Sequence, residues 1–395
     1  MSTPAALFRN AIDLNRFSNG VAKRIVTTYN DLVLDAVDQL RGIDELAAPA
    51  KAARLRAILA QLKQSLEGWA GSSTAVAVTE LQGLAELQSA FVIEELRKAL
   101  PIELRDQIRS VQISPQFARS VATVDPTVIN VVSLSDDLQA AVAGAPQTFS
   151  LTAAQGTAIT LPNGKVLEKS FRGLAVAQAE LFAKTVRNGL LTGESTDKIA
   201  RRLKGRLRFG QPGSVRQVVQ AGGDSTSMAN RQVMAVIRTS INQVANTASQ
   251  QVYEANQDIT SKYRYTATLD SRTSPICRAL DGREFEYGKG PTPPQHFNCR
   301  STTVPVIDYK ALGLTPPKPG KRAAQGGMVP DTQSYGQWLN DQSKEVKADV
   351  LGPEKVPYFN RLAKKYGPTD AIRKFVSGDG SELTLDQLRR RYPNG

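Results

Sequence analysis

The chain of 395 residues contains one histidine, His296, and two cysteines, Cys277 and Cys299. A single histidine nearly excludes a Ser-His-Asp triad and a metal site with several histidine ligands. Two cysteines cannot form a disulfide framework, and a reducing cytoplasm suits such a composition. The chain has no run of 18 or more apolar residues, so no membrane span is predicted. Its N-terminus lacks the basic and apolar regions of a secretory signal.

Acidic residues are scarce in the C-terminal part of the chain, and this sets the sign of its charge. Residues 1–150 have 14 Lys/Arg and 16 Asp/Glu, a net charge of −2, whereas residues 151–395 have 36 and 21, a net charge of +15. The whole excess of +13 therefore lies in the second part. A positive field of this kind favours polyanionic partners, of which nucleic acid and an acidic protein are the two candidates.

Residues 4–100 have the periodicity of long amphipathic helices. Apolar residues recur at spacings of three, four and seven from Leu14 to Leu40, and again from Leu55 to Trp69. Residues 42–49 and 71–74 are predicted connections, which gives three helices. Helical periodicity then fades, and the segment AITLPNGKVLEK is a hairpin candidate with its turn at Asn163-Gly164.

Helices and strands are both predicted after residue 170. Ser195 is placed to cap a basic helix, and apolar residues from Val233 to Ala255 step by three and four, which predicts a helix over about 227–256. The period then becomes two, and strands are expected at 263–269, 283–287 and 302–307. In the tail, KRAAQGG is predicted to be a loop, and SYGQWLNDQ and LTLDQLRRRY are predicted to be helical.

These patterns predict an α+β fold that is mostly α-helical, with a small antiparallel β-sheet. We expect an elongated N-terminal helical arm at 1–104, an irregular or hairpin region at 105–170, an α+β core at 171–310, and a basic helical C-terminal extension at 311–395.

The most informative window holds both cysteines and the histidine. It reads DSRTSPICRALDG, then a Gly/Pro-rich spacer, then PPQHFNCRSTTVP, so that Cys277, His296 and Cys299 lie on turns between predicted strands. Thiolate and imidazole are zinc ligands, but a closed structural site takes four of them. Asp270 or Asp281 is a candidate fourth ligand. The alternatives are a strand–turn–strand knuckle without metal, or a Cys277–Cys299 disulfide, which a cytoplasmic origin disfavours.

This window resembles the phage head morphogenesis family, the Mu-type minor head proteins, whose signature is D-x-R-x-C-P-x-C-x-x-L-D-G followed by P-x-H-x-x-C-R-C. Ser274 and Ser301 stand where that signature has two further cysteines. The segments VRNGLLTGESTDKIARRLKG, VIRTSINQVANTA, YGQWLNDQ and DVLGPEK also resemble the family, and together the similar segments span residues 170–355.

The resemblance implies a structural minor head protein of a tailed phage, associated with the portal and active in head assembly. The implied partners are the portal protein, other capsid proteins and packaged double-stranded DNA, with a copy number set by portal symmetry. The implied location is the virion, in the capsid interior or at the portal vertex, and the host cytoplasm during assembly. No enzymatic activity and no resident cofactor are expected, zinc at the knuckle being the open question.

A cluster of basic residues is the candidate contact with the phosphates of duplex DNA, and it would bind without sequence preference. Its members are Arg201, Arg202, Lys204, Arg206, Arg208 and Arg216. The alternatives are a solvated surface and an acidic protein partner. A DNA-binding protein that acts independently of capsids is the second interpretation of the whole chain.

A pair of glutamates provides a remote third interpretation. Glu284-Phe285-Glu286 on a strand, with Arg238 upstream, faintly resembles the arrangement of arginine-type ADP-ribosyltransferases. A solvated strand face explains the same pattern, and we consider this the better interpretation.

Overall fold

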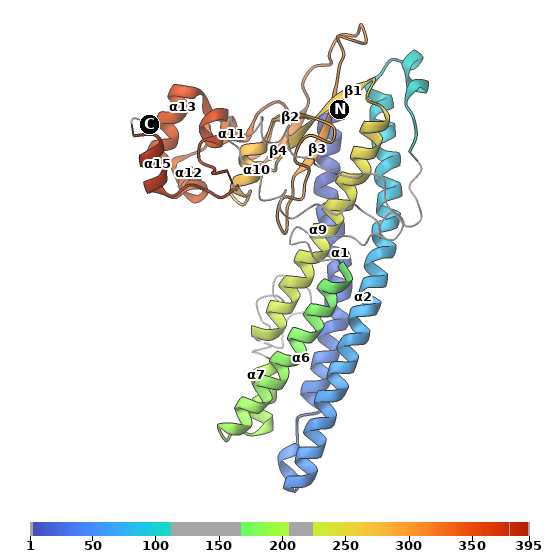
Figure 1. The fold of residues 1–395 in the computed structure, drawn as a ribbon, viewed down its shortest axis with the longest axis vertical. Helices are drawn as coiled ribbons and strands as arrows, with labels where there is room; N and C mark the ends of the chain where they lie inside the picture. The colour runs from blue at the N-terminus through green and yellow to red at the C-terminus, as the bar shows by residue number, and fades with distance from the viewer. Residues whose placement is uncertain (1–2, 112–166, 205–223, 379, 394–395) are drawn as a thin grey trace. The chain divides into compact units, whose positions relative to one another are not determined.

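The computed structural model describes residues 3–111, 167–204, 224–378 and 380–393 (Figure 1). Long helices dominate them: α1 (Thr3–Asp38), α2 (Ala48–Ala99), α6 (Leu167–Leu191), α7 (Thr196–Lys204) and α9 (Asp224–Ala255). Short 3-10 turns follow α1 and α2, at Ile43–Glu45 and Ile102–Gln107. None of the helices in these ranges is long and apolar enough to cross a membrane.

The chain divides into two compact units. One unit comprises Met1–Asn15, Gln82–Gly164 and Ile241–Gly395, and the other comprises Arg16–Leu81 and Lys165–Ser240. We call them the knuckle unit and the helical unit. Since the divisions at 15/16, 81/82 and 240/241 fall inside helices, α1, α2 and α9 each contribute to both.

The helical unit is built around the indole of Trp69 on α2. The ring centroid of Trp69 lies 5.3 Å from that of Tyr29 on α1 and 5.8 Å from that of Phe171 on α6. Its Nε1 donates a hydrogen bond of 3.1 Å to the carbonyl oxygen of Ile25, and the Tyr29 hydroxyl donates to Gln178 Oε1 at 3.1 Å. The indole N–H of Trp69 and the hydroxyl of Tyr29 are thus both hydrogen-bonded, which reduces the cost of burying them.

Helix α2 is continuous through residues 71–74, so the predicted connection there is wrong. Gly71 and three hydroxyl residues suggest a break locally, but the buried stripe continues without interruption. Ser72 Oγ and Thr74 Oγ1 donate to the carbonyls of Trp69 and Ala70, at 3.1 and 2.8 Å, instead of disrupting the helix. Tertiary burial outweighs the weak propensity of these residues. The buried stripe consists of Ala70, Ser73, Ala77, Leu81, Leu84 and Ala85.

The knuckle unit contains a three-stranded antiparallel sheet in the order β2-β1-β3, formed by β1 (Thr260–Thr266), β2 (Glu284–Glu286) and β3 (Thr302–Ile307). The three predicted strands are confirmed, as is the helix before them. Tyr263 of β1 pairs with Phe285 of β2 and with Pro305 of β3. The helix α10 (Pro275–Leu280) lies between β1 and β2 in the sequence.

The outer edge of β3 is bonded to side chains of α9. Asn246 Oδ1 accepts from the Thr303 amide at 3.1 Å, and the Tyr253 hydroxyl donates to the Thr303 carbonyl at 3.3 Å. Asn242 Nδ2 donates to the Ser301 carbonyl at 2.9 Å. These side chains replace the missing fourth strand, which explains why a buried helix carries so many amides and hydroxyls.

The segment KRAAQGG is a β-hairpin and not the predicted loop. Strands β4 (Lys321–Ala324) and β5 (Gly327–Pro330) pair antiparallel around Gln325-Gly326. Gly326 at the turn has a φ of +96°, a conformation that glycine adopts without strain. Leu269, after β1, bridges to Ala324, so the hairpin continues the knuckle unit rather than leaving it.

Five short helices complete the chain around one apolar core that includes Trp338, Leu339, Phe359, Phe375 and Leu388. The predicted helices in SYGQWLNDQ and LTLDQLRRRY are confirmed as the first and last of these five helices. They are α11 (Tyr335–Asn340), α12 (Lys344–Leu351), α13 (Val356–Tyr366), α14 (Pro368–Arg373) and α15 (Leu385–Arg391).

The chain is therefore α+β and mostly helical, as the sequence predicted. Most of the hairpin candidate AITLPNGKVLEK lies outside the described residues. The end of the predicted second strand of this hairpin is wrong, because Leu167, Glu168 and Lys169 belong to helix α6, which begins at Leu167. The four predicted domains stay a prediction.

Candidate functional site

The first half of the site is a tight turn that leads into α10. Asp270 Oδ1 accepts hydrogen bonds from the amide of Arg272 and the hydroxyl of Thr273, both at 3.1 Å. Ser274 then caps α10, its Oγ accepting from the Cys277 amide, and Pro275 occupies the first turn, where a missing N–H costs nothing. This local sequence fixes Cys277 in the first turn of the helix, where its side chain is buried.

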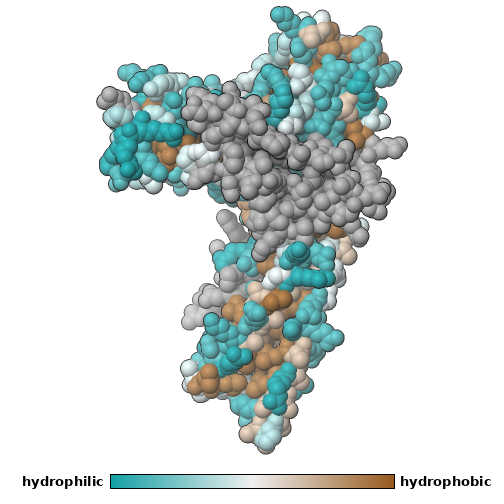
Figure 2. Space-filling model, in the orientation of Figure 1, coloured by the Kyte–Doolittle hydropathy of each residue, from teal (hydrophilic) through white to brown (hydrophobic). Residues whose placement is uncertain are grey.

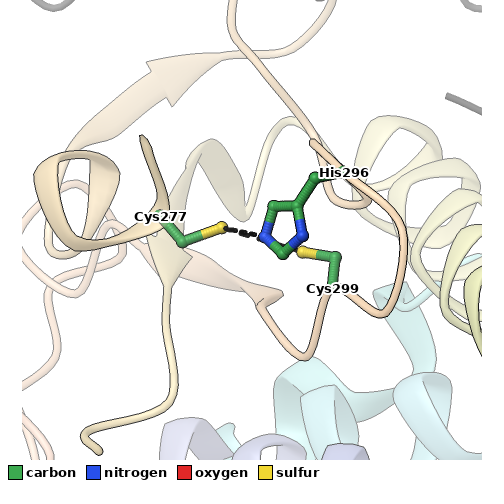
Figure 3. Close-up of side chains that lie close together, drawn as sticks. All are labelled: Cys277, His296 and Cys299. Carbon is green, nitrogen blue, oxygen red and sulfur yellow. Dashed lines mark hydrogen bonds between the residues drawn. The ribbon is translucent and has the colours of Figure 1, made fainter. Parts of the chain in front are cut away.

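The second half is the turn from His296 to Cys299. The Cys299 amide donates to the carbonyl of His296 at 3.2 Å, and Asn298 adopts a φ of +59°. Asparagine tolerates this left-handed conformation better than most residues. The turn places the imidazole and the second thiol next to Cys277, from the opposite side of the knuckle (Figure 3).

The three side chains converge on one point. The Sγ atoms of Cys277 and Cys299 lie 3.8 Å apart, and Cys277 Sγ lies 3.3 Å from His296 Nε2 (Figure 3). All three ligand atoms lie within 4.8 Å of one another. The structure thus brings together all three residues that the sequence nominated for a metal.

This geometry fits a tetrahedral zinc ion. With Zn–S near 2.3 Å and Zn–N near 2.0–2.1 Å, two tetrahedral ligands lie about 3.8 Å apart for two sulfurs and about 3.5 Å apart for sulfur and nitrogen. The observed separations, 3.8 and 3.3 Å, are close to these. The Nδ1–H of His296 donates to the Phe297 carbonyl at 2.9 Å, so in the neutral ring the lone pair of Nε2 faces the thiols.

An oxygen atom, Oγ of Ser274, lies near the position that a fourth zinc ligand would occupy. Ser274 Oγ lies 2.7 Å from His296 Nε2, which places its hydroxyl where the related motif has a thiolate. The two aspartates considered as fourth ligands have other partners. Asp270 is bonded to Arg300 at 2.7 Å, and Asp281 is bonded to Arg322 at 2.9 Å. The fourth-ligand prediction of Asp270 or Asp281 thus finds both aspartates engaged elsewhere, whereas Ser274 adjoins the cluster.

The two thiols differ in their electrostatics. Burial raises the pKa of Cys277 well above its usual value, and the hydrogen bond and charge of Cys299 raise it further. Burial alone would also raise the pKa of Cys299, but hydrogen bonds with Cys277 and His296 and the charge of His296 outweigh it, and the net pKa lies well below its usual value. The hydroxyl of Tyr265 lies 3.2 Å from Cys277 Sγ. The cluster thus favours a thiolate at Cys299 even without a metal ion, which suits a metal site.

Asp281 and Arg322 form a buried ion pair next to this site. The sequence analysis did not identify this pair. Asp281, directly after α10, accepts from the Ala267 amide at 2.7 Å, the Tyr335 amide at 2.6 Å and the guanidinium of Arg322. One carboxylate thus joins the sheet, the hairpin and the C-terminal helices. In the sequence, the one indication of a role for Asp281 was its position in the LDG stretch of the motif.

The predicted basic cluster is only partly described. Arg201 and Arg202 lie on α7, and Lys204 is its last residue, whereas Arg206, Arg208 and Arg216 lie outside the described residues. Ser195 accepts from the Lys198 amide at 3.2 Å and so begins the helix as predicted. Arg202 forms an ion pair with Glu194 at 3.1 Å, which reduces the charge available to a polyanion.

The glutamates of the third interpretation form ordinary surface ion pairs. Glu284 and Glu286 are both exposed on β2, on the same face of the strand. Glu284 pairs with Arg264 at 2.9 Å and Glu286 with Lys289 at 2.6 Å. This arrangement is that of a solvated strand face.

The fold and the site together define a structural knuckle domain, in which two thiols and an imidazole join turns of a small sheet beneath a long helix. The particular family follows from comparison: residues 180–304 match the family model described as Phage Mu protein F like protein. This match confirms the predicted resemblance to the phage head morphogenesis family over residues 180–304. Comparisons with curated proteins and with solved structures gave no match.

Proposed function

We propose that the chain is a structural component of a tailed-phage head that binds at the portal, in several copies set by portal symmetry. The match of residues 180–304 to the Mu F-like family carries this proposal. The knuckle within that range supports a structural role, because its two thiols are buried and His296 Nδ1 is bonded to a backbone carbonyl and not to an acid. Such an arrangement lacks the third member of a catalytic triad.

The surface of the helical unit supports docking on another protein. Hydrophobic residues are interspersed with hydrophilic ones on its exposed face (Figure 2). Apolar side chains exposed on helices are a common basis for protein association. The large exposed apolar residues of this unit are Phe17, Leu46, Val76, Val176 and Leu191.

The experiment is a search for the chain in purified phage particles by mass spectrometry, together with co-purification with the portal ring. Val176→Ser/Leu191→Ser should weaken portal co-purification, whereas Met328→Ser, an equally polar change at an exposed position of the knuckle unit, should not. Absence of the chain from particles would refute the proposal. Presence in particles with no effect of the double substitution would refute only this docking surface.

We further propose that the knuckle binds one zinc ion through Cys277, His296 and Cys299, with Ser274 or a water molecule at the fourth position. The sulfur–sulfur and sulfur–nitrogen separations support this proposal. Elemental analysis of the purified chain is the test. A zinc content near one per chain is expected, and a content near zero would refute it.

Contact with packaged duplex DNA through Arg201, Arg202, Lys204, Arg206, Arg208 and Arg216 is also part of the proposal, supported by the +15 charge of residues 151–395. A DNA-binding protein independent of capsids is the second candidate. It predicts tight, salt-sensitive binding to free duplex and no co-purification with a portal. The transferase alternative predicts NAD turnover that disappears in Glu286→Ala, and the absence of turnover would exclude it.

A further inference from the structure

The C-terminal helices carry a group of lysines and arginines without acidic partners. In the described ranges, no carboxylate lies within ion-pair distance of Lys364, Lys365, Lys374, Arg390 or Arg391, although neighbouring basic residues are paired. Lys355, for example, pairs with Glu382 at 2.6 Å, and Arg373 with Asp370 at 2.9 Å. Strongly hydrophilic residues cover this part of the molecule (Figure 2).

Tyrosine rings hold these cations together. The Lys374 ammonium lies 4.5 Å from the ring centroid of Tyr366 and 5.5 Å from that of Tyr392, so it stands between α13 and the end of α15. Lys365 approaches Tyr366 at 5.2 Å. One turn earlier on α13, Arg361 lies 4.4 Å above Tyr358. Cation–π contact lowers the cost of bringing like charges together without neutralising any of them.

Two of the three rings are fixed by the core beneath them. Tyr358 and Tyr392 pack against the apolar cluster of the five C-terminal helices, while Tyr366 is 41% exposed. We call Tyr358, Arg361, Lys364, Lys365, Tyr366, Lys374, Arg390, Arg391 and Tyr392 the tyrosine–lysine patch. Because the Lys374 ammonium also contacts Tyr392, a ring that packs on this core, it loses less side-chain entropy when it binds a ligand.

We propose that the tyrosine–lysine patch binds the phosphate backbone of double-stranded DNA. The lysines and arginines of the patch that lack a carboxylate partner, Lys364, Lys365, Lys374, Arg390 and Arg391, suit closely spaced phosphates. The ring faces are already used by Lys374, Lys365 and Arg361 or by the core, so unstacked bases have no platform, which favours duplex over single strands. The patch is separate from the α7 cluster. The inference rests on the proposed function in one respect only, which is that the DNA bound in the phage would be the packaged genome.

The test is the affinity of the full chain for a short labelled duplex, measured by fluorescence anisotropy between about 50 and 200 mM salt. In Lys365→Gln/Lys374→Gln, the slope of log affinity against log salt should fall in magnitude by about 2, and the affinity at about 0.1 M salt should fall on the order of 50-fold. Lys374→Arg should retain most of the binding, because arginine keeps both the charge and the ring contact.

The matched control is Lys310→Gln/Lys318→Gln, which removes the same charge from exposed positions outside the patch. It should change the slope much less, and equal effects of the two double variants would overturn the proposal. Tighter binding to single strands, or displacement of the duplex by poly-glutamate as effectively as by unlabelled duplex, would also overturn it. The assay uses purified chain. A negative result would therefore refute DNA binding by the patch without testing whether the chain enters phage heads.

Discussion

The carboxylate of Asp281 and the guanidinium of Arg322 form a buried ion pair with two contacts, of 2.9 and 3.2 Å, and their side chains are 1% and 4% exposed. Removing one partner of such a pair leaves an unpaired charge in the interior. Because Asp281 also accepts from two backbone amides, the pair connects three parts of the knuckle unit.

Arg322→Leu should therefore destabilise the chain strongly. We expect a loss of about 3–5 kcal/mol in the free energy of unfolding, measured by urea denaturation. The matched control is Arg264→Leu, which breaks the surface pair with Glu284, whose two side chains are 31% and 38% exposed. That change should cost less than about 1 kcal/mol. Similar costs for the two variants would contradict this account of the buried pair.

The fourth ligand position can be tested by restoring a thiol. Ser274→Cys should bring a third sulfur to the cluster and raise zinc affinity at least about tenfold, because a thiolate is a far better zinc ligand than a hydroxyl. Competition with a chromophoric chelator measures the change. Ser65→Cys, which adds a thiol to α2 in the helical unit, should have no effect on affinity. If neither the original chain nor Ser274→Cys binds zinc, the metal proposal is refuted.

Two glycines in helices should respond in opposite directions to alanine. A Cβ at Gly71 of α2 meets nothing within 4 Å, so Gly71→Ala should raise the free energy of unfolding by about 0.5–1 kcal/mol. A Cβ at Gly336 of α11 would lie 2.2 Å from the backbone oxygen of Pro368. Gly336→Ala should therefore cost roughly 1–3 kcal/mol through overpacking. Thermal unfolding of the two variants side by side checks both signs.

Glu254 on α9 should make stability depend on pH. Partial burial raises its pKa from 4.5 to about 7. A carboxyl group whose folded pKa is raised binds its proton more tightly in the folded state, so the penalty is absent below pH 4.5, grows between pH 4.5 and 7, and is complete above that range. Discounted for exposure to water, the penalty is about 1 kcal/mol.

Glu254→Gln should accordingly stabilise the chain at pH 8 and have little effect at pH 4, as read from urea midpoints. The control is Glu286→Gln. A hydrogen bond from Lys289 lowers the pKa of Glu286, so its removal should act in the opposite direction at pH 8. A stabilising effect of both substitutions would contradict the assignment of the effect to the burial of Glu254.

Periodic parts of the fold were predictable, because burial imposes a repeat that the sequence displays. The stripe from Val233 to Ala255 predicted α9, and the alternation around Tyr263 predicted β1. The continuity of α2 was not predictable from residues 71–74, because the decisive contribution is the buried stripe on either side. The KRAAQGG hairpin was missed since it lacks β-branched residues, and its strand β4 is held by Leu269 and Asp281, which lie far away in the sequence.

The candidate site was predictable to the extent that its chemistry is local. Cys277, His296 and Cys299 lie within a short window, and rare residue types made them conspicuous. The tyrosine–lysine patch gave no such signal. Its residues come from α13, the end of α14 and α15, and only the packing of those helices brings Tyr366, Lys374 and Tyr392 together.

The amides and hydroxyls of α9 that bond the outer edge of β3 also shield it from other chains. An open strand offers its backbone to any neighbour, which favours edge-to-edge association. Here Asn242, Asn246 and Tyr253 bind the carbonyl of Ser301 and both backbone groups of Thr303 within the same molecule. At Thr303, a strand of a second chain therefore finds no free backbone group to pair with.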